Sequence, residues 1–113
     1  MHELSVTQGM LDIALEKAKE ARASRITAIN LVIGEMSSII DDCVQFYFDF
    51  LSKDSIASGA KLTFTRIPMQ VRCRSCGFSF QPGKTAWSCP QCGKWDAQVV
   101  AGQEFYVESI EVE

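Results

Sequence analysis

Residues 73–77 read Cys-Arg-Ser-Cys-Gly and residues 89–93 read Cys-Pro-Gln-Cys-Gly, so the chain carries the pattern Cys-x-x-Cys-Gly twice. The two-residue spacer allows both thiolates of one turn to face the same ion, and the glycine can take the positive φ that such a turn needs. Four thiolates fill a tetrahedral zinc shell and leave no position open for a substrate water. We therefore predict a structural Zn(II) ion held by Cys73, Cys76, Cys89 and Cys92.

Two other states of these cysteines fit the same spacing. An iron ion in a tetrathiolate site uses the same turns and makes the protein red, whereas zinc leaves the solution colourless. Two disulfides need an oxidising compartment, but residues 1–20 alternate charged and apolar side chains where an export signal is continuously apolar. The spacing and the expected compartment favour zinc.

The segment around the cysteines differs in composition from the rest of the chain. Residues 69–100 contain the four paired cysteines, both tryptophans and two of the three prolines. Roughly 32 residues do not make a stable core unaided, so we expect the ion to organise this segment as a separate module. Its aromatic residues are expected to cover the metal site; they are Phe78, Phe80, Trp87 and Trp95.

Outside this module the sequence alternates helical and strand-like patterns. Apolar residues recur at three- and four-residue steps in 4–25, and again after Ser37 and Ser38, which are expected to cap a second helix ahead of Asp41. Strands are predicted at 26–33, 61–67 and 103–112. The apolar residues of the last strand change phase, which predicts a bulge or burial on both faces.

This order of elements predicts an α+β fold, with two helices packed on a small three-stranded sheet and a zinc-ribbon-like module inserted before the last strand. The expected domains are an α+β domain formed by 1–68 plus 101–113 and a zinc-binding module at 69–100. The length of 113 residues allows one such domain and one small module.

Composition and charge exclude several classes of protein. Apolar residues make up 47% of the chain and charged residues 22%, which is typical of a folded globular protein and not of a disordered one. The net charge of -3 gives no general attraction to nucleic acid or to anionic lipid. No apolar run approaches the roughly 18 residues that cross a bilayer. We expect a cytoplasmic protein with no membrane or nucleic-acid partner.

The N-terminus offers a second metal site of different chemistry. His2 is the single histidine of the chain, and its imidazole, its backbone nitrogen and the α-amine of Met1 can form linked chelate rings around one ion. Glu3 and Asp41 can add oxygen ligands. Three nitrogens near one plane suit Ni(II) or Cu(II) and not a closed sulfur cage. The alternative is that His2 belongs to a frayed terminus and binds nothing.

These residues resemble those of a known family. The opening Met1-His2-Glu3, the Gly34-Glu35 after the first strand and the late pair of cysteine turns closely resemble the HypA/HybF hydrogenase maturation nickel metallochaperones. The resemblance covers essentially the whole chain. It implies a nickel-binding α+β domain that takes Ni(II) as cargo through the N-terminal amine and His2, and a structural zinc ion on the four cysteines. It also implies transfer of nickel to the large subunit of NiFe hydrogenase.

The resemblance further implies the GTPase HypB as a partner. In some organisms, members of this family also support urease, with urease accessory proteins as partners. We expect no enzymatic activity, because a single histidine and a sulfur-closed zinc ion leave no acid–base constellation. The alternative from another class is a zinc-ribbon interaction module that binds nucleic acid or an unrelated protein. Its expected contact patch consists of Arg66, Arg72 and Arg74.

Overall fold

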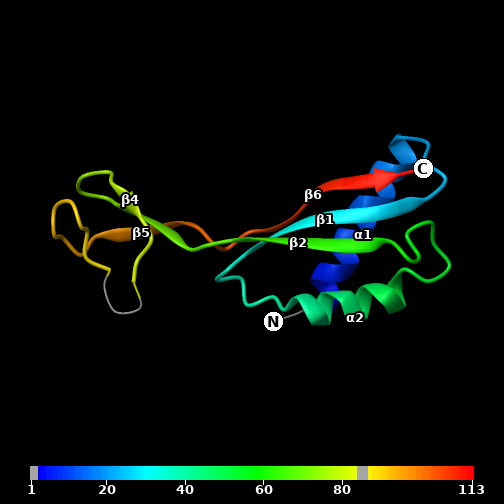
Figure 1. Ribbon diagram of the computed structural model, residues 1–113, viewed down its shortest axis with the longest axis horizontal. Helices are drawn as coiled ribbons and strands as arrows, with labels where there is room; N and C mark the ends of the chain where they lie inside the picture. The colour runs from blue at the N-terminus through cyan, green and yellow to red at the C-terminus, as the bar shows by residue number, and fades with distance from the viewer. Residues whose placement is uncertain (1–2, 84–86) are drawn as a thin grey trace. The chain divides into compact units, whose positions relative to one another are not determined.

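The computed structural model describes residues 3–83 and 87–113, and the chain divides into two compact units (Figure 1). The first unit consists of Met1–Val32, Ser38–Thr65 and Phe105–Glu113, and the second of Ile33–Ser37 and Arg66–Glu104. The second unit therefore consists mainly of one continuous segment inserted into the sequence of the first.

Helix α1 (Glu3–Glu20) begins at an acidic residue and ends in a backbone turn. Glu3 in the first turn complements the positive end of the helix dipole. Beyond the helix, the N–H of Ala23 donates to the carbonyl of Ala18 at 2.9 Å, and Arg22 takes a positive φ of 55°. This is a Schellman-type end, and it stops the helix several residues before the limit expected from the apolar spacing.

Helix α2 (Asp41–Leu51) begins without a side-chain cap, so the predicted serine cap is wrong. Ile40 occupies the N-cap position with extended backbone, and Ser38 lies before it with a positive φ of 58°. Asp41 and Asp42 in the first turn stabilise the helix start through their charge instead.

The first unit is held together by an apolar core in which α1 packs against α2 and against the last strand of the sheet. Val44 and Phe48 of α2 lie one turn apart and are both fully buried. The buried apolar residues of α1 also recur at helical spacing; they are Met10, Leu11, Ala14 and Ala18.

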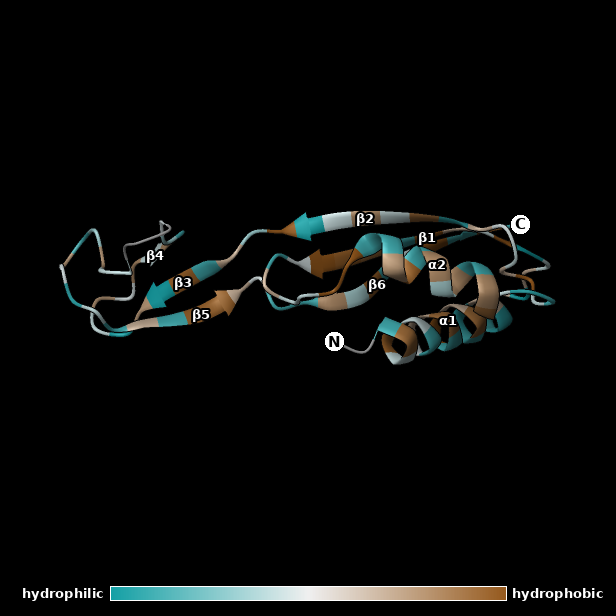
Figure 2. Ribbon diagram, turned by 90° about the horizontal axis from the view of Figure 1, so that it is seen from below, coloured by the Kyte–Doolittle hydropathy of each residue, from teal (hydrophilic) through white to brown (hydrophobic). Residues whose placement is uncertain are grey.

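The sheet of the first unit has three strands in the order β2-β1-β6. They are β1 (Ile26–Gly34), β2 (Lys61–Ile67) and β6 (Phe105–Val112). The central strand β1 is largely buried, and Figure 2 shows it in hydrophobic colour towards its end. Polar side chains link all three strands, because Asn30 donates to Ser109 at 2.9 Å and accepts a hydrogen bond from Thr63 at 2.5 Å.

Strand β6 lies at one edge of this sheet. None of its residues is buried, so the expected burial on both faces is wrong. Its half-buried residues change phase between Val107 and Ile110, which matches the irregular apolar spacing of the sequence. An edge strand tolerates such a change because it has a neighbouring strand on one side only.

The second unit contains another three-stranded sheet in the order β4-β3-β5. Its strands are β3 (Gln70–Cys73), β4 (Ser79–Phe80) and β5 (Ala97–Ala101). Both pairings are antiparallel, and Cys73 at the end of β3 lies opposite Ala97 at the start of β5. The predicted α+β fold, with two helices, a small three-stranded sheet and a zinc-ribbon-like insert before the last strand, is confirmed.

Within the described residues, no helix combines the length and the apolar character that a membrane crossing requires.

Candidate metal centre

The two Cys-x-x-Cys-Gly segments form the same backbone turn. In the first, the N–H of Gly77 donates to the carbonyl of Cys73 at 2.8 Å, and the N–H of Cys73 donates to the carbonyl of Phe78 at 2.9 Å. In the second, the N–H groups of Gly93 and Cys89 make the equivalent bonds at the same two distances. Both glycines have positive φ, 80° and 76°, as the sequence pattern predicts.

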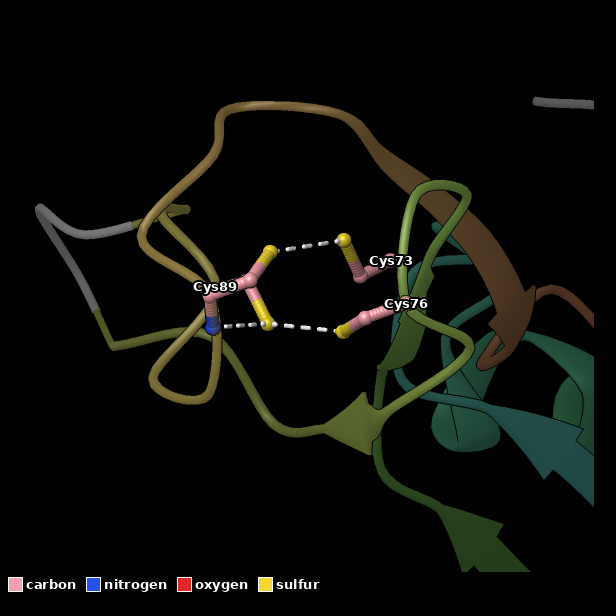
Figure 3. A group of neighbouring side chains, drawn as sticks. Cys73, Cys76 and Cys89 are labelled. Carbon is pink, nitrogen blue, oxygen red and sulfur yellow. Dashed lines mark hydrogen bonds between the residues drawn. The ribbon is translucent and has the colours of Figure 1, made fainter.

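These turns bring four sulfur atoms together. The Sγ of Cys73 lies 3.6 Å from that of Cys92, the Sγ of Cys76 lies 3.5 Å from that of Cys89, and all four lie within 4.8 Å of one another. Figure 3 shows Cys73 and Cys76 of the first turn pointing towards Cys89 of the second. Over residues 3–83 and 87–113, they form the one group of three or more His, Cys, Asp or Glu side chains close enough to hold an ion.

The sulfur spacing fits a tetrahedral metal. Zinc–sulfur bonds of about 2.3 Å place the ligands of a regular tetrahedron about 3.8 Å apart, close to the two observed distances of 3.5 and 3.6 Å. A disulfide requires about 2.05 Å, so these pairs are free thiols and not disulfides. A tetrathiolate iron ion would use the same four sulfurs. The donor set therefore suits a closed, soft metal site.

Backbone N–H groups stabilise negative charge on the two buried sulfurs. The N–H groups of Gln91 and Cys92 each donate to the Sγ of Cys89 at 3.4 Å. Burial raises the pKa of Cys89, but the N–H groups of Cys92 and Gln91, together with hydrogen bonds to the side chains of Cys76 and Cys92, outweigh it and bring the pKa down to about 7. At Cys73 the backbone N–H of Cys76 lowers the pKa in the same way.

The two exposed cysteines keep their protons more firmly. At Cys76 the backbone N–H of Phe78 lowers the pKa, but partial burial and the contact with Cys89 raise it overall, to about 12. At Cys92 the backbone N–H of Lys94 also lowers the pKa, but partial burial and a neighbouring thiol raise it overall. Each close pair thus joins a sulfur whose pKa is lowered to one whose pKa is raised. A metal ion that binds all four must displace protons.

Aromatic side chains cover this site less than expected. Phe78 stacks on Phe80 with ring centroids 6.3 Å apart, but Trp95 is 73% exposed, so the expectation that it covers the metal is wrong. The interior position of the small sheet is taken by Val71, which is fully buried in β3. A metal ion bound by the four cysteines would therefore supply stability that an aromatic core does not provide in this segment.

Sequence reasoning missed Asp96, which fastens the first turn to the segment before β5. Its carbonyl accepts a hydrogen bond from the N–H of Arg74 at 2.8 Å, and its carboxylate accepts one from Ser75 Oγ at 3.3 Å. The carboxylate also lies 3.8 Å from the Arg74 guanidinium. One sequence signal was present, because Asp96 is the single acidic residue in 69–100.

The predicted nickel ligands are placed only in part. Met1 and His2 lie outside the described residues. Glu3 is the first residue of α1 and Asp41 the first of α2. In both views the first turns of these packed helices lie at the same end of the pair (Figures 1 and 2), so the two acidic residues lie at that end.

Known structures share this fold. The chain matches a solution structure of HypA protein with a TM-score of 0.82 and 24% identity, covering 100% of this chain and 97% of that one. It also matches the solution structure of the Ni metallochaperone HypA from Helicobacter pylori with a TM-score of 0.71 and 24% identity, covering 99% of this chain and 97% of that one.

Known sequences are similar over the full length. Hydrogenase maturation factor HypA of Dehalococcoides mccartyi is 51% identical over 113 residues, which are 100% of this chain and 95% of that protein. Hydrogenase maturation factor HypA of Caldanaerobacter subterraneus is 42% identical over 114 aligned positions that cover both chains completely. A family model described as "Hydrogenase/urease nickel incorporation, metallochaperone, hypA" matches residues 1–112.

The fold is a small α+β domain with a zinc-ribbon-like insert that carries four cysteines, and the family match over residues 1–112 gives its class, the metallochaperones. Within that class, this chain belongs to the HypA family of nickel metallochaperones in hydrogenase maturation. The resemblance noted in the sequence is confirmed.

Proposed function

We propose that this chain is a non-catalytic carrier that binds Ni(II) at its N-terminus and delivers it for the maturation of NiFe hydrogenase. The match to a nickel-incorporation family over residues 1–112 is the observation that supports this function most strongly. The recipient is the hydrogenase large subunit and the partner is the GTPase HypB, with urease accessory proteins as further partners. The setting is the cytoplasm, without nucleic acid or membrane.

The proposed nickel ligands are the α-amine of Met1 and the backbone and imidazole nitrogens of His2, with oxygen from Glu3 and Asp41. The positions of Glu3 and Asp41 as first residues of two packed helices support their part in one site. The nitrogen donors favour a tetragonal ion such as Ni(II). Such a site is reversible, because protons compete for the imidazole and the amine as the pH falls through about 6.5.

The proposed role of the cysteines is structural. Cys73, Cys76, Cys89 and Cys92 would hold one Zn(II) ion, which supplies the folding free energy that a segment of this size lacks. The proposed domains are the nickel-binding domain, 1–68 plus 101–113, and the zinc-binding module, 69–100. A colourless protein with one zinc ion per chain supports this assignment, and a red protein would assign iron instead.

Nickel titration of the zinc-loaded chain tests the carrier function. We expect one Ni(II) per wild-type chain, and an affinity in His2→Ala that is lower by more than about tenfold, the loss that even an outer-shell change can cause. Blocking the amine by acetylation should weaken binding as well, because it removes one ligand. Unchanged stoichiometry and affinity in His2→Ala would reject the carrier function.

The two acidic residues need matched controls, because any loss of charge weakens cation binding slightly. Glu3→Gln should weaken nickel binding more than Glu16→Gln, which removes an exposed charge from the same helix. Asp41→Asn should likewise weaken nickel binding more than Asp49→Asn, which removes an exposed charge from α2. Equal effects within either pair would remove that residue from the ligand set.

A further inference from the structure

Helix α2 carries an exposed aromatic stripe that neither metal site uses. Phe46 and Phe50 lie one turn apart and are 70% and 66% exposed, although Val44 and Phe48 of the same helix are fully buried. The helix therefore has two apolar faces, and one of them packs into its own unit. Exposed apolar side chains that gather on one face, unlike scattered ones, are a feature of interaction surfaces.

Acidic side chains border this stripe. Asp42 and Asp49 are exposed, and the helical period places them beside Phe46 and Phe50 within about one third of the helix circumference. Residues 41–51 contain three aspartates and no lysine or arginine. We refer to Asp42, Phe46, Asp49 and Phe50 as the α2 face. It combines an apolar centre with an anionic edge.

Contacts within the chain hold the side chains of the α2 face. Phe46 meets Tyr47 edge-on, with ring centroids 5.4 Å apart and an interplanar angle of 75°. The carboxylate of Asp49 accepts a hydrogen bond from Gln45 at 2.8 Å. Lys53 places its ammonium group 5.9 Å from the centre of the Phe50 ring, so a cation already lies against this ring. Positioned groups lose less conformational entropy when a partner binds.

We propose that the α2 face docks an amphipathic helix of a partner protein, whose apolar ridge lies on Phe46 and Phe50 and whose lysine or arginine side chains meet Asp42 and Asp49. Helices bind in this way through anchors spaced three and four residues apart. The two aspartates favour a basic partner over the other candidates for this face. A second copy of this chain would bring the aspartates of one α2 against those of the other, and anionic lipid would be repelled as well. The proposal is independent of nickel, because none of the four residues is a proposed metal ligand.

A synthetic peptide serves as the probe. It is a fluorescein-labelled helix of about 18 residues, long enough to fold, with leucine on one face and lysine on the other. Fluorescence anisotropy measures its binding to the full zinc-loaded chain. We expect the double variants Phe46→Ala/Phe50→Ala and Asp42→Asn/Asp49→Asn each to weaken binding by about tenfold or more. Glu16→Gln/Glu20→Gln removes the same charge from exposed positions of α1 and should change binding by less than about twofold.

The variants keep their fold because all the substituted side chains are exposed, and circular dichroism verifies this. Several results would overturn the proposal. The α1 variant weakening binding as much as the α2 variants would indicate general attraction between charges. If Phe46→Ala/Phe50→Ala binds the peptide as tightly as wild type, the two phenylalanine rings take no part in the interaction. A wild-type dimer in sedimentation velocity that this variant dissociates would assign the face to a second copy, and Phe-dependent binding to phosphatidylcholine vesicles would assign it to lipid.

Discussion

Replacing Gly34 with alanine tests a close backbone approach in the second unit. A Cβ at this position would press on the carbonyl group of Gly102 and would lie 2.5 Å from the backbone nitrogen of Gln103, where contacts under 3.0 Å force a shift. Backbone atoms cannot rotate out of the way as a side chain can. One of the two segments must therefore move.

That movement breaks hydrogen bonds of the segment 33–37. Its N–H groups at Gly34, Glu35 and Met36 donate to carbonyl oxygens of neighbouring segments at 2.6 to 2.8 Å. Losing one or two of these bonds costs about 1 kcal/mol each, and forcing an extra methyl group into packed structure costs about 1–3 kcal/mol. We therefore expect Gly34→Ala to reduce the free energy of unfolding of the second unit by about 2–5 kcal/mol.

Two probes separate the units in a urea titration at fixed zinc concentration. Trp87 and Trp95, the two tryptophans of the chain, both belong to the second unit, whereas α1 and α2 belong to the first. Tryptophan fluorescence should therefore report the reduced stability of the second unit. Far-ultraviolet circular dichroism follows the helices of the first unit.

Gly9→Ala is the matched control for this prediction. A Cβ at Gly9 meets nothing within 4 Å, and Gly9 lies inside α1, so alanine should stabilise the chain by about 1 kcal/mol. If Gly34→Ala leaves the fluorescence midpoint unchanged in fully zinc-loaded protein, the close approach of the two segments is not a feature of the molecule.

Three further predictions concern the second unit. Cys76→Ser should lower the zinc affinity and the zinc content below one ion per chain, as measured by competition with a chromophoric chelator, because one of four thiolates is lost. The slope of log zinc affinity against pH should steepen by about one proton as the pH falls through about 7, since Cys89 then also gives up a proton to the metal; an unchanged slope contradicts the lowered pKa. Val71→Ala should cost about 1–3 kcal/mol in urea unfolding, because Val71 is fully buried, whereas Trp95→Ala should cost less than about 0.5 kcal/mol.

Local patterns in the sequence predicted most of the fold. The strand expected at 61–67 coincides with β2, because alternation of apolar residues reports a half-buried strand directly. The predicted start of α2 was wrong because tertiary packing decides where this helix begins. Ile39 is 4% exposed, so the chain turns to bury this side chain, and Ile40 then takes the N-cap position in place of a serine. Capping residues predict a helix start only where no buried neighbour competes.

The metal centre was also predicted only in part. Spacing alone predicted the four cysteines that the structure brings together. It could not show which sulfurs ionise, because that depends on N–H groups directed at Cys89 and Cys73 by the folded turns. The helical spacing of apolar residues predicted the second helix, but only packing separates its buried face from the exposed Phe46 and Phe50.

The covalent path from residues 33–37 of the second unit to helix α2 of the first is short. Residues 33–37 belong to the second unit, which contains the four cysteines, and Asp41 begins a helix of the first unit. Three residues, 38–40, lie between them, and one of these, Ile39, is buried. We expect a shift of 33–37 to be passed along the chain to the start of α2, because only three residues separate the two segments and one of them is buried. If Gly34→Ala binds nickel as wild type does, α2 is positioned by its own unit alone, and the cysteine module does not influence the cargo site through this path.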